Sequence, residues 1–222
     1  MSHNAQGNGG LHCNIIDHPL ARTNLRIMRD ENTDQVSFCA AVKKLTPLLV
    51  YAATTDLALM NTEIKTPIAS MIAQEISERI VLVPILRSGF GMVEPTKEIF
   101  PKATIICAGM ARDEKTAIPY WYYAIKALSK LDGGIGAVFL VLDPMLATGG
   151  SAIETMKEIK SVYPAGSIKM ISMIAAPEGI KALNNAYPDV QITVAAVDDH
   201  LNQVKYIVPG LGDAGDRQFG TV

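Results

Sequence analysis

This chain of 222 residues has little cysteine, few aromatic residues and almost no net charge, and these shortages exclude several classes of protein. The three cysteines, Cys13, Cys39 and Cys107, form no closely spaced disulfide framework, which indicates a reducing, cytoplasmic compartment. The formal net charge is -2, so the composition suggests no nucleic-acid surface. Any anion that the protein binds must therefore be held by local groups.

Long apolar runs and histidine constellations are also missing. No apolar stretch reaches the roughly 18 residues of a membrane span, so we expect no contact with a membrane. His12, Cys13 and His18 lack a well-spaced fourth ligand for zinc, and no Ser/His/Asp or Cys/His pattern indicates a nucleophile. The polar start of the chain, residues 1–12, has no signal-peptide pattern and is predicted to be flexible.

The chain does contain apolar, β-rich runs that alternate with amphipathic segments. Most runs are continuous, which is typical of strands covered on both faces. With 49% hydrophobic residues, the sequence predicts one α/β domain, residues 1–222, with a mostly parallel central sheet and flanking helices. We expect strands at 79–86, 103–110, 137–143, 168–176, 190–198 and 204–209, and helices at 150–163 and 177–188.

Two regions depart from this alternation. Residues 20–78 have a mainly helical pattern, with Thr33 as a candidate N-cap and Pro47 expected to kink or end its helix. Residues 111–136 form an insertion whose length is typical of an arm or a lid. A hairpin that merely packs against the body explains this insertion equally well.

The stretch LDPMLATGGS joins a predicted buried strand to a predicted helix. Thr148, Gly149, Gly150 and Ser151 would expose backbone N–H groups at a helix N-terminus, an arrangement that binds phosphate. The lysine of a nucleotide-triphosphate P-loop is missing, which favours a single phosphate monoester. Asp143 would repel phosphate but can accept hydrogen bonds from sugar hydroxyls, so a phosphorylated ribose satisfies both halves. An ordinary strand-to-helix turn is the alternative.

Two further patterns point to anions and to a flat polar ligand. Arg87 and Arg112 each follow a predicted strand, where a guanidinium can bind phosphate in bidentate fashion, although a solvated or salt-bridged arginine is the plainer interpretation. The segment PGLGDAGD has the glycine spacing of a dinucleotide loop, but too few residues follow Gly215 for a βαβ unit. Its glycines could instead present backbone donors and acceptors to a flat polar ligand.

Several long motifs together resemble the uracil phosphoribosyltransferase family, in order from about His18 to the C-terminus. They are PILRSGFGM, LDPMLATGGSA, AAPEG and YIVPGLGDAGDRQFGT. The resemblance implies the type I phosphoribosyltransferase fold, with a hood and an extended arm. It also implies a pentosyltransferase of pyrimidine salvage, which joins N1 of uracil to C1 of 5-phosphoribosyl 1-diphosphate and releases UMP and diphosphate.

The resemblance further implies roles for individual residues and partners. Asp143 and Asp213 correspond to carboxylates that face the ribose and stabilise its charge during the reaction. A magnesium ion, held mainly by the substrate's diphosphate, at least a homodimer, and a nucleotide effector such as GTP are also implied. The implied phosphoribosyl diphosphate site comprises Arg87, Arg112, Asp143, Pro144, Met145, Leu146, Ala147, Thr148, Gly149, Gly150, Ser151 and Asp213, and the implied uracil site comprises Ile207, Gly212, Asp213 and Ala214.

Some positions depart from the family pattern. Many members have Ala-Gly-Leu where this chain has Ser88-Gly89-Phe90, and Leu-Tyr where it has Met110-Ala111. Pro144 stands where many phosphoribosyltransferases carry a second acid, so one carboxylate must meet the ribose at this strand end. A nucleotide-sensing regulatory protein on the same fold is the alternative function, but the complete ligand loops and the absence of a basic patch argue against it.

Overall fold

The computed structural model describes residues 12–112, 119–123, 136–164 and 166–221. Its helices are α1 (Pro19–Arg29), α2 (Gln35–Ala53), the 3-10 helix η1 (Ser88–Met92), α3 (Val93–Ile99), α4 (Gly150–Val162), α5 (Pro177–Ala186) and α6 (Ala214–Phe219). Its strands are β1 (Asn14–Ile15), β2 (Leu59–Lys65), β3 (Ser70–Ile76), β4 (Arg79–Leu86), β5 (Thr104–Ile105), β6 (Ala108–Arg112), β7 (Pro119–Tyr123), β8 (Ala137–Leu142), β9 (Met145–Leu146), β10 (Ser167–Ala175), β11 (Gln191–Val197), β12 (His200–Leu201) and β13 (Ile207–Val208).

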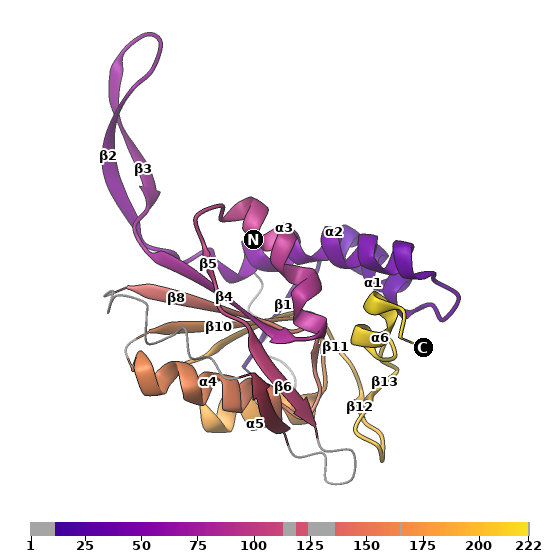
Figure 1. Ribbon diagram of the computed structural model, residues 1–222. Helices are drawn as coiled ribbons and strands as arrows, with labels where there is room; N and C mark the ends of the chain where they lie inside the picture. The colour runs from indigo at the N-terminus through magenta and orange to yellow at the C-terminus, as the bar shows by residue number, and fades with distance from the viewer. Residues whose placement is uncertain (1–11, 113–118, 124–135, 165, 222) are drawn as a thin grey trace.

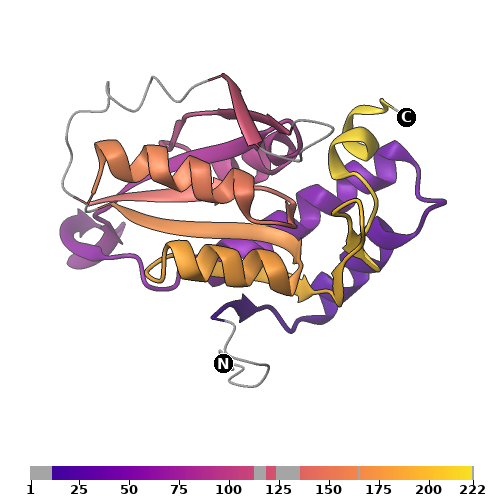
Figure 2. The same cartoon turned by 90° about the horizontal axis from the view of Figure 1, so that it is seen from below.

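A mostly parallel sheet forms the centre of the molecule. Its strand order is β1-β11-β10-β8-β4-β6-β7, and the short strands β5 and β9 pair with β4 and β10. Along this order the described strands pair in parallel, except for β6 and β7, which are antiparallel. Helices α4 and α5 cover one face of the sheet, and α2 and α3 lie over the other (Figures 1 and 2). The predicted α/β architecture is confirmed.

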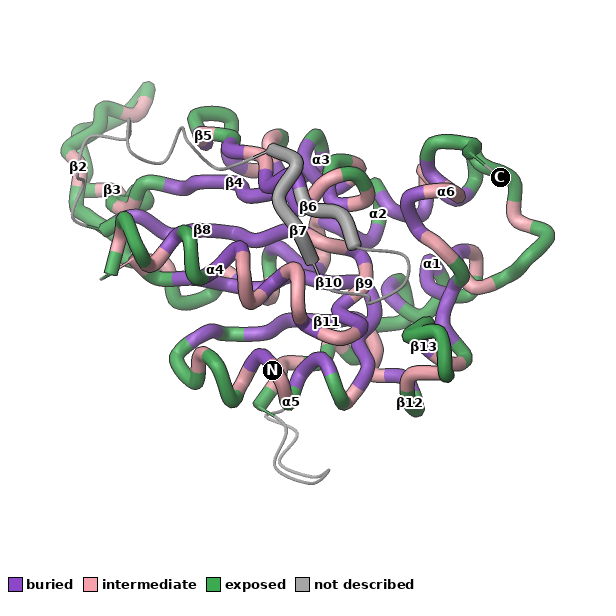
Figure 3. Tube along the Cα trace, turned by 60° about the horizontal axis from the view of Figure 1, so that its bottom comes forward, coloured by how far each residue is buried: buried purple, intermediate pink, exposed green. Residues whose placement is uncertain are grey.

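The core lies on both faces of the sheet, as the continuous apolar runs predict. Every residue of β8 is buried, and so are the residues of β4 between its two ends (Figure 3). One apolar cluster fills the space between the sheet and helices α1 and α2, and a second fills the space beneath α4 and α5. Burial on two faces fixes the strands, so their carboxyl ends form a rigid edge for a site.

Helix α2 begins one residue later than predicted and does not end at its proline. Asp34 is the N-cap, and its carboxylate accepts a hydrogen bond of 2.7 Å from the backbone N–H of Ser37. Asp34 follows the predicted cap, Thr33. The helix continues past Pro47. By length and composition α2 could cross a membrane, but it lies against the sheet with Phe38 fully buried, which is the environment of a core helix.

The prediction of a mainly helical segment over 20–78 is wrong in its last part. Strands β2 and β3 form an antiparallel hairpin that projects from the body (Figure 1). Its turn is closed by Thr66, whose backbone N–H donates to the carbonyl of Ala69 at 2.9 Å. Both strands are largely exposed, so no alternation of buried and exposed residues was available to reveal them.

Two other expectations need correction. The run 103–110 is divided between β5 and β6, and the run 204–209 provides only β13, which pairs with β12 outside the main sheet.

Of the insertion 111–136, the backbone of Pro119–Tyr123 forms an edge strand against β6. Residues 113–118 and 124–135 lie outside the described part, so the expected arm or lid stays a prediction.

A buried lysine at the amino-terminal side of the sheet forms an ion pair whose two partners should differ in how much their removal destabilises the fold. Lys169 is 2% exposed, and its ammonium donates to Asp56 at 2.6 Å. Partial burial opposes the ionisation of Asp56, but hydrogen bonds from Lys169 and Gln191 outweigh it and lower the pKa of this carboxyl. Its contribution to stability is therefore present above the ordinary pKa of an aspartate, about 4, and is lost as acid titrates it.

We expect Asp56→Ala to lower the free energy of unfolding by about 2–4 kcal/mol, because it leaves the buried Lys169 ammonium without its carboxylate. Lys169→Met removes the buried charge itself and should cost less. Urea denaturation at pH 7 measures both changes. A larger loss for Lys169→Met would contradict this account.

Candidate functional site

The loop between β8 and α4 contains the predicted phosphate-binding residues and is fixed by neighbouring strands. The carbonyl of Pro144 accepts hydrogen bonds from the backbone N–H groups of Met173 and Ile174, at 3.0 and 3.1 Å. The carbonyl of Leu146 accepts one from Ala176 at 3.0 Å. The loop therefore follows the carboxyl end of β10 and delivers the chain to the N-terminus of α4.

Helix α4 starts at a glycine in a left-handed conformation. Gly149 is its N-cap with φ of 80°, a region that side chains disfavour. The backbone N–H of Gly150 donates to the Thr148 hydroxyl at 3.4 Å. The loop residues Thr148 to Ser151 thus surround the start of a helix of thirteen residues, where the helix dipole and N–H groups favour an anion.

Helix α5 approaches the same loop closely. A Cβ on Gly179 would lie 2.3 Å from the carbonyl oxygen of Ala147 and 2.7 Å from that of Leu146, which no side chain can satisfy. Gly179 belongs to the AAPEG motif, which has no predicted contact with a ligand. Its role in the structure is to let α5 support the loop from behind.

Ser88 links this loop to the C-terminal segment. Its hydroxyl donates to the Asp143 carboxylate at 3.2 Å, and its carbonyl accepts from the Gln218 side chain at 3.0 Å. A Cβ on Gly215 would lie 4.0 Å from the Ser88 Cβ and 3.1 Å from an Asp213 carboxylate oxygen. Gly215, two residues after Asp213, therefore lies beside Ser88, which itself contacts Asp143, so the C-terminal segment and the phosphate loop meet at Ser88.

The C-terminal turn connects β13 to α6, and the predicted base-binding residues lie in this turn and at its two ends. Gly210 and Gly212 have φ of 68° and 77°. Asp213 is the N-cap of α6, and its carboxylate accepts a hydrogen bond of 2.9 Å from the backbone N–H of Asp216. Ile207 and Ala214 are buried, so their side chains are not presented at the surface.

The two predicted arginines have different environments. The Arg87 guanidinium donates to Asp216 at 3.1 Å and lies 5.8 Å from the ring of Phe219. Its side chain remains 56% exposed, and Arg87 directly precedes Ser88, which contacts Asp143. The backbone of Arg112 ends β6, next to β4 in the sheet, and its side chain lies outside the described residues.

Three side chains that support the site had no assigned role in the sequence interpretation. Arg29 forms a bidentate ion pair with Asp198, directly after β11. Arg217 donates to the carbonyls of Leu211 and Asp30, at 2.9 and 2.7 Å. Burial lowers the pKa of Arg217, and the nearby Asp30 carboxylate opposes this shift. Asp198 could have been identified as a site residue from its position at the carboxyl end of a predicted strand. Its partner, Arg29, is too distant in the sequence to be predicted from it.

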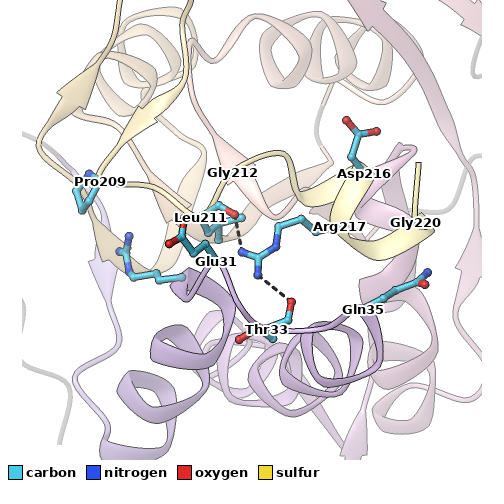
Figure 4. Close-up of a pocket in the computed structure, with 10 residues that line it drawn as sticks. Glu31, Thr33, Gln35, Pro209, Leu211, Gly212, Asp216, Arg217 and Gly220 are labelled. Carbon is cyan, nitrogen blue, oxygen red and sulfur yellow. Dashed lines mark hydrogen bonds between the residues drawn. The ribbon is translucent and has the colours of Figure 1, made fainter. Parts of the chain in front are cut away.

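A cavity of about 460 Å³ adjoins the C-terminal turn on the side of the α1–α2 connection. Arg217 projects across it from α6 towards Leu211 and Thr33 (Figure 4). Its wall comprises Arg29, Glu31, Thr33, Gln35, Pro209, Leu211, Gly212, Asp216, Arg217 and Gly220. Gly212 is the residue that this cavity shares with the predicted uracil site.

Comparison with solved structures first defines the class of protein. Adenine phosphoribosyltransferase from Leishmania donovani matches with a TM-score of 0.53 at 14% identity, covering 89% of this chain and 88% of its own. A likeness at this identity concerns the fold alone. Together with the parallel sheet and the loop at its edge, it places the chain among the type I phosphoribosyltransferase folds.

Closer relatives define the family. The family model "Uracil phosphoribosyltransferase" matches residues 15–221. Curated uracil phosphoribosyltransferases from Malacoplasma penetrans and Roseiflexus castenholzii are 46% and 47% identical, each over 93% of this chain and 98% and 97% of their own lengths. A solved structure from Aquifex aeolicus matches at 35% identity with a TM-score of 0.85, over 92% and 96% of the two chains. The chain belongs to the uracil phosphoribosyltransferase family.

Proposed function

We propose that this chain transfers the 5-phosphoribosyl group of 5-phosphoribosyl 1-diphosphate to N1 of uracil, with UMP and diphosphate as products. One observation carries the assignment of the site. Ser88 contacts Asp143 of the phosphate loop and lies next to the C-terminal turn, so the two predicted binding segments adjoin at one edge of the sheet. A phosphorylated sugar and a flat base can then bind side by side.

The reaction exchanges one bond at C1 of the ribose. The C1–O bond breaks with its electron pair leaving on diphosphate, while N1 of uracil forms the new bond and loses its proton. Positive charge develops on the sugar, as in glycoside hydrolysis, and the carboxylates of Asp143 and Asp213 stabilise it. Arg87 and Arg112 hold the negatively charged diphosphate.

The remaining assignments follow the two segments. Thr148 to Ser151 bind the 5-phosphate through the N-terminus of α4. Backbone groups of Ile207, Gly212, Asp213 and Ala214 read the base. Uracil and cytosine differ in donors and acceptors at N3 and C4, so a fixed set of backbone groups rejects cytosine by leaving groups unpaired.

A magnesium ion is part of the proposal. Within the described ranges, no three His, Cys, Asp or Glu side chains converge on one point. The single carboxylates Asp143 and Asp213 suit an ion that takes one or two protein ligands and completes its shell with substrate phosphates. When bound, the ion would neutralise charge on the departing diphosphate.

The direct test is formation of UMP from uracil, 5-phosphoribosyl 1-diphosphate and magnesium. Cytosine, hypoxanthine and orotate are run in parallel, and GTP is added in a further series to test the proposed effector. We expect turnover with uracil alone among the four bases. No UMP from well-folded protein would contradict the proposed function, as would preferred turnover of another base.

The Ser88 departure gives a smaller, specific prediction. Ser88→Ala removes the hydroxyl that donates to Asp143 and adds no atom, so the smaller side chain fits the same space. We expect kcat with uracil to fall about three- to tenfold, the value of one hydrogen bond of about 1 kcal/mol, with unchanged melting temperature. Ser161→Ala, on the exposed side of α4, is the matched control. Equal kinetics for both variants would show that the hydrogen bond from Ser88 to Asp143 does not contribute to catalysis.

We also propose that a second copy of the chain covers the β2–β3 hairpin. Exposed apolar groups concentrated on one projecting element are typical of an association surface. We expect a dimer or larger oligomer by light scattering, and its dissociation by Ile72→Lys. Val204→Lys, an exposed position on another segment, should leave it intact, and a monomeric wild-type chain would refute the assignment. The exposed residues are Leu59, Met60, Ile64, Ile68, Met71, Ile72 and Ile76.

A cytoplasmic location completes the proposal. Cys13, Cys39 and Cys107 are free thiols. Burial raises the pKa of Cys13 and of Cys107, which keeps these thiols protonated and unreactive. Such cysteines suit a reducing compartment. Localisation of the tagged protein in fractionated cells tests this assignment.

A further inference from the structure

Both backbone polar groups of Gly210 are held by one ion pair, in which Asp198 is buried and Arg29 is partly buried. The Arg29 guanidinium donates to the Gly210 carbonyl at 2.7 Å and to Asp198 at 2.8 Å. The same Asp198 oxygen accepts the Gly210 N–H at 2.8 Å, and the aspartate side chain is 4% exposed. Arg29, Asp198 and Gly210 thus form a closed set of hydrogen bonds, which we call the turn clamp.

A second arginine holds the next carbonyl. Arg217 donates to Leu211 at 2.9 Å and also to the carbonyl of Met28, which precedes Arg29 in α1. Its guanidinium lies 4.5 Å from the ring of Phe38 in α2. Helices α1 and α2 therefore restrain two successive peptide groups of the C-terminal turn from the side of the cavity in Figure 4.

Such restraint matters because the turn is built from glycine. Gly210 and Gly212 occupy the left-handed region, where glycine has wide conformational freedom. Backbone groups distinguish uracil from cytosine only if their peptide planes cannot rotate to suit either base. Base recognition by this turn needs fixed peptide planes, and the two glycines do not fix theirs by themselves.

We propose that the turn clamp is a positioning device for base recognition, acting through the backbone of Gly210 without touching the substrate. The inference rests on the proposed function for its consequence in catalysis. The phosphate loop has separate supports in β10 and α5, so loss of the clamp should affect the base far more than 5-phosphoribosyl 1-diphosphate.

Two conservative variants test the clamp in the full-length chain. Arg29→Lys keeps the charge but loses the bidentate fork, and Asp198→Asn keeps the shape but loses the charge. The matched controls are Arg22→Lys and Asp17→Asn, which alter an exposed ion pair beside the same helix. Hydrogen exchange across residues 207–214 is measured for all variants, together with KM for each substrate.

We expect exchange in 207–214 to accelerate at least tenfold in both clamp variants. KM for uracil should rise about tenfold and the preference for uracil over cytosine should fall by a similar factor, the effect of about 1.4 kcal/mol. KM for 5-phosphoribosyl 1-diphosphate should change less than about twofold, a difference below about 0.5 kcal/mol. The controls should match the wild type.

Unchanged hydrogen exchange of residues 207–214 in folded Arg29→Lys would contradict the proposal that the clamp holds the turn. An equal rise in KM for uracil and for 5-phosphoribosyl 1-diphosphate would mean that the clamp has only a structural role. The exchange measurement needs no turnover. A wild-type chain that fails to make UMP would therefore contradict the proposed function, while the exchange rates would still decide whether the clamp holds the turn.

Discussion

Asp213→Asn is expected to reduce kcat with uracil by about 10²- to 10³-fold, the range seen when one preorganised electrostatic group is removed from a transition state. The Asp213 carboxylate has one observed role and one proposed role. It is proposed to stabilise charge on the ribose, and it accepts the Asp216 N–H at the start of α6. Asparagine caps a helix about as well as aspartate, so this substitution removes the charge and keeps the cap.

Asp213→Ala is the matched comparison, because it removes both the charge and the cap. We expect the same loss of kcat, with an additional loss of about 1 kcal/mol in the free energy of unfolding. Steady-state kinetics and urea denaturation separate the two effects. If Asp213→Asn retained full kcat, the carboxylate would have only its capping role.

Arg87→Ala should raise KM for 5-phosphoribosyl 1-diphosphate about 10- to 100-fold, since a charge-assisted bond to a phosphate contributes about 1.5–3 kcal/mol. KM for uracil should change little. The ion pair of Arg87 with Asp216 is half exposed, so its loss should alter stability by less than about 1 kcal/mol. Thermal melting checks that the variant is folded.

Asp216→Asn separates the two partners of Arg87. It removes the carboxylate that holds the guanidinium in this structure and leaves the guanidinium present. We expect KM for 5-phosphoribosyl 1-diphosphate to stay the same or fall. Matching increases in Asp216→Asn and Arg87→Ala would mean that Arg87 acts through the ion pair rather than through the diphosphate.

Local sequence predicted the sheet best where burial was continuous. The strand at 79–86 has the predicted bounds, and the run 137–143 ends one residue early, at Leu142. Both strands are covered on two faces, which gives an uninterrupted apolar run. The hairpin was missed for the opposite reason, because exposed strands that pair only with each other need no apolar pattern.

The motifs also predicted which segments meet at the edge of the sheet, but not what holds them there. LDPMLATGGS predicted the strand, the loop and the helix start, and the structure added that the N-cap is Gly149, with φ of 80°. The family resemblance gave the roles proposed for Asp143 and Asp213. The contact of Ser88 with Asp143 spans 55 residues, and no spacing rule connects them.

The sequence by itself determined the fold class, the family and the candidate ligand segments, because these depend on short-range patterns of burial, glycine and charge. Only the tertiary structure decided that Arg29 reaches Asp198 and Gly210, at separations of 169 and 181 residues. Which carboxylate the partly buried Arg29 guanidinium meets depends on how α1 and β11 pack together. The physical reason is that a buried charge needs a partner in space, and the folded chain alone brings that partner near.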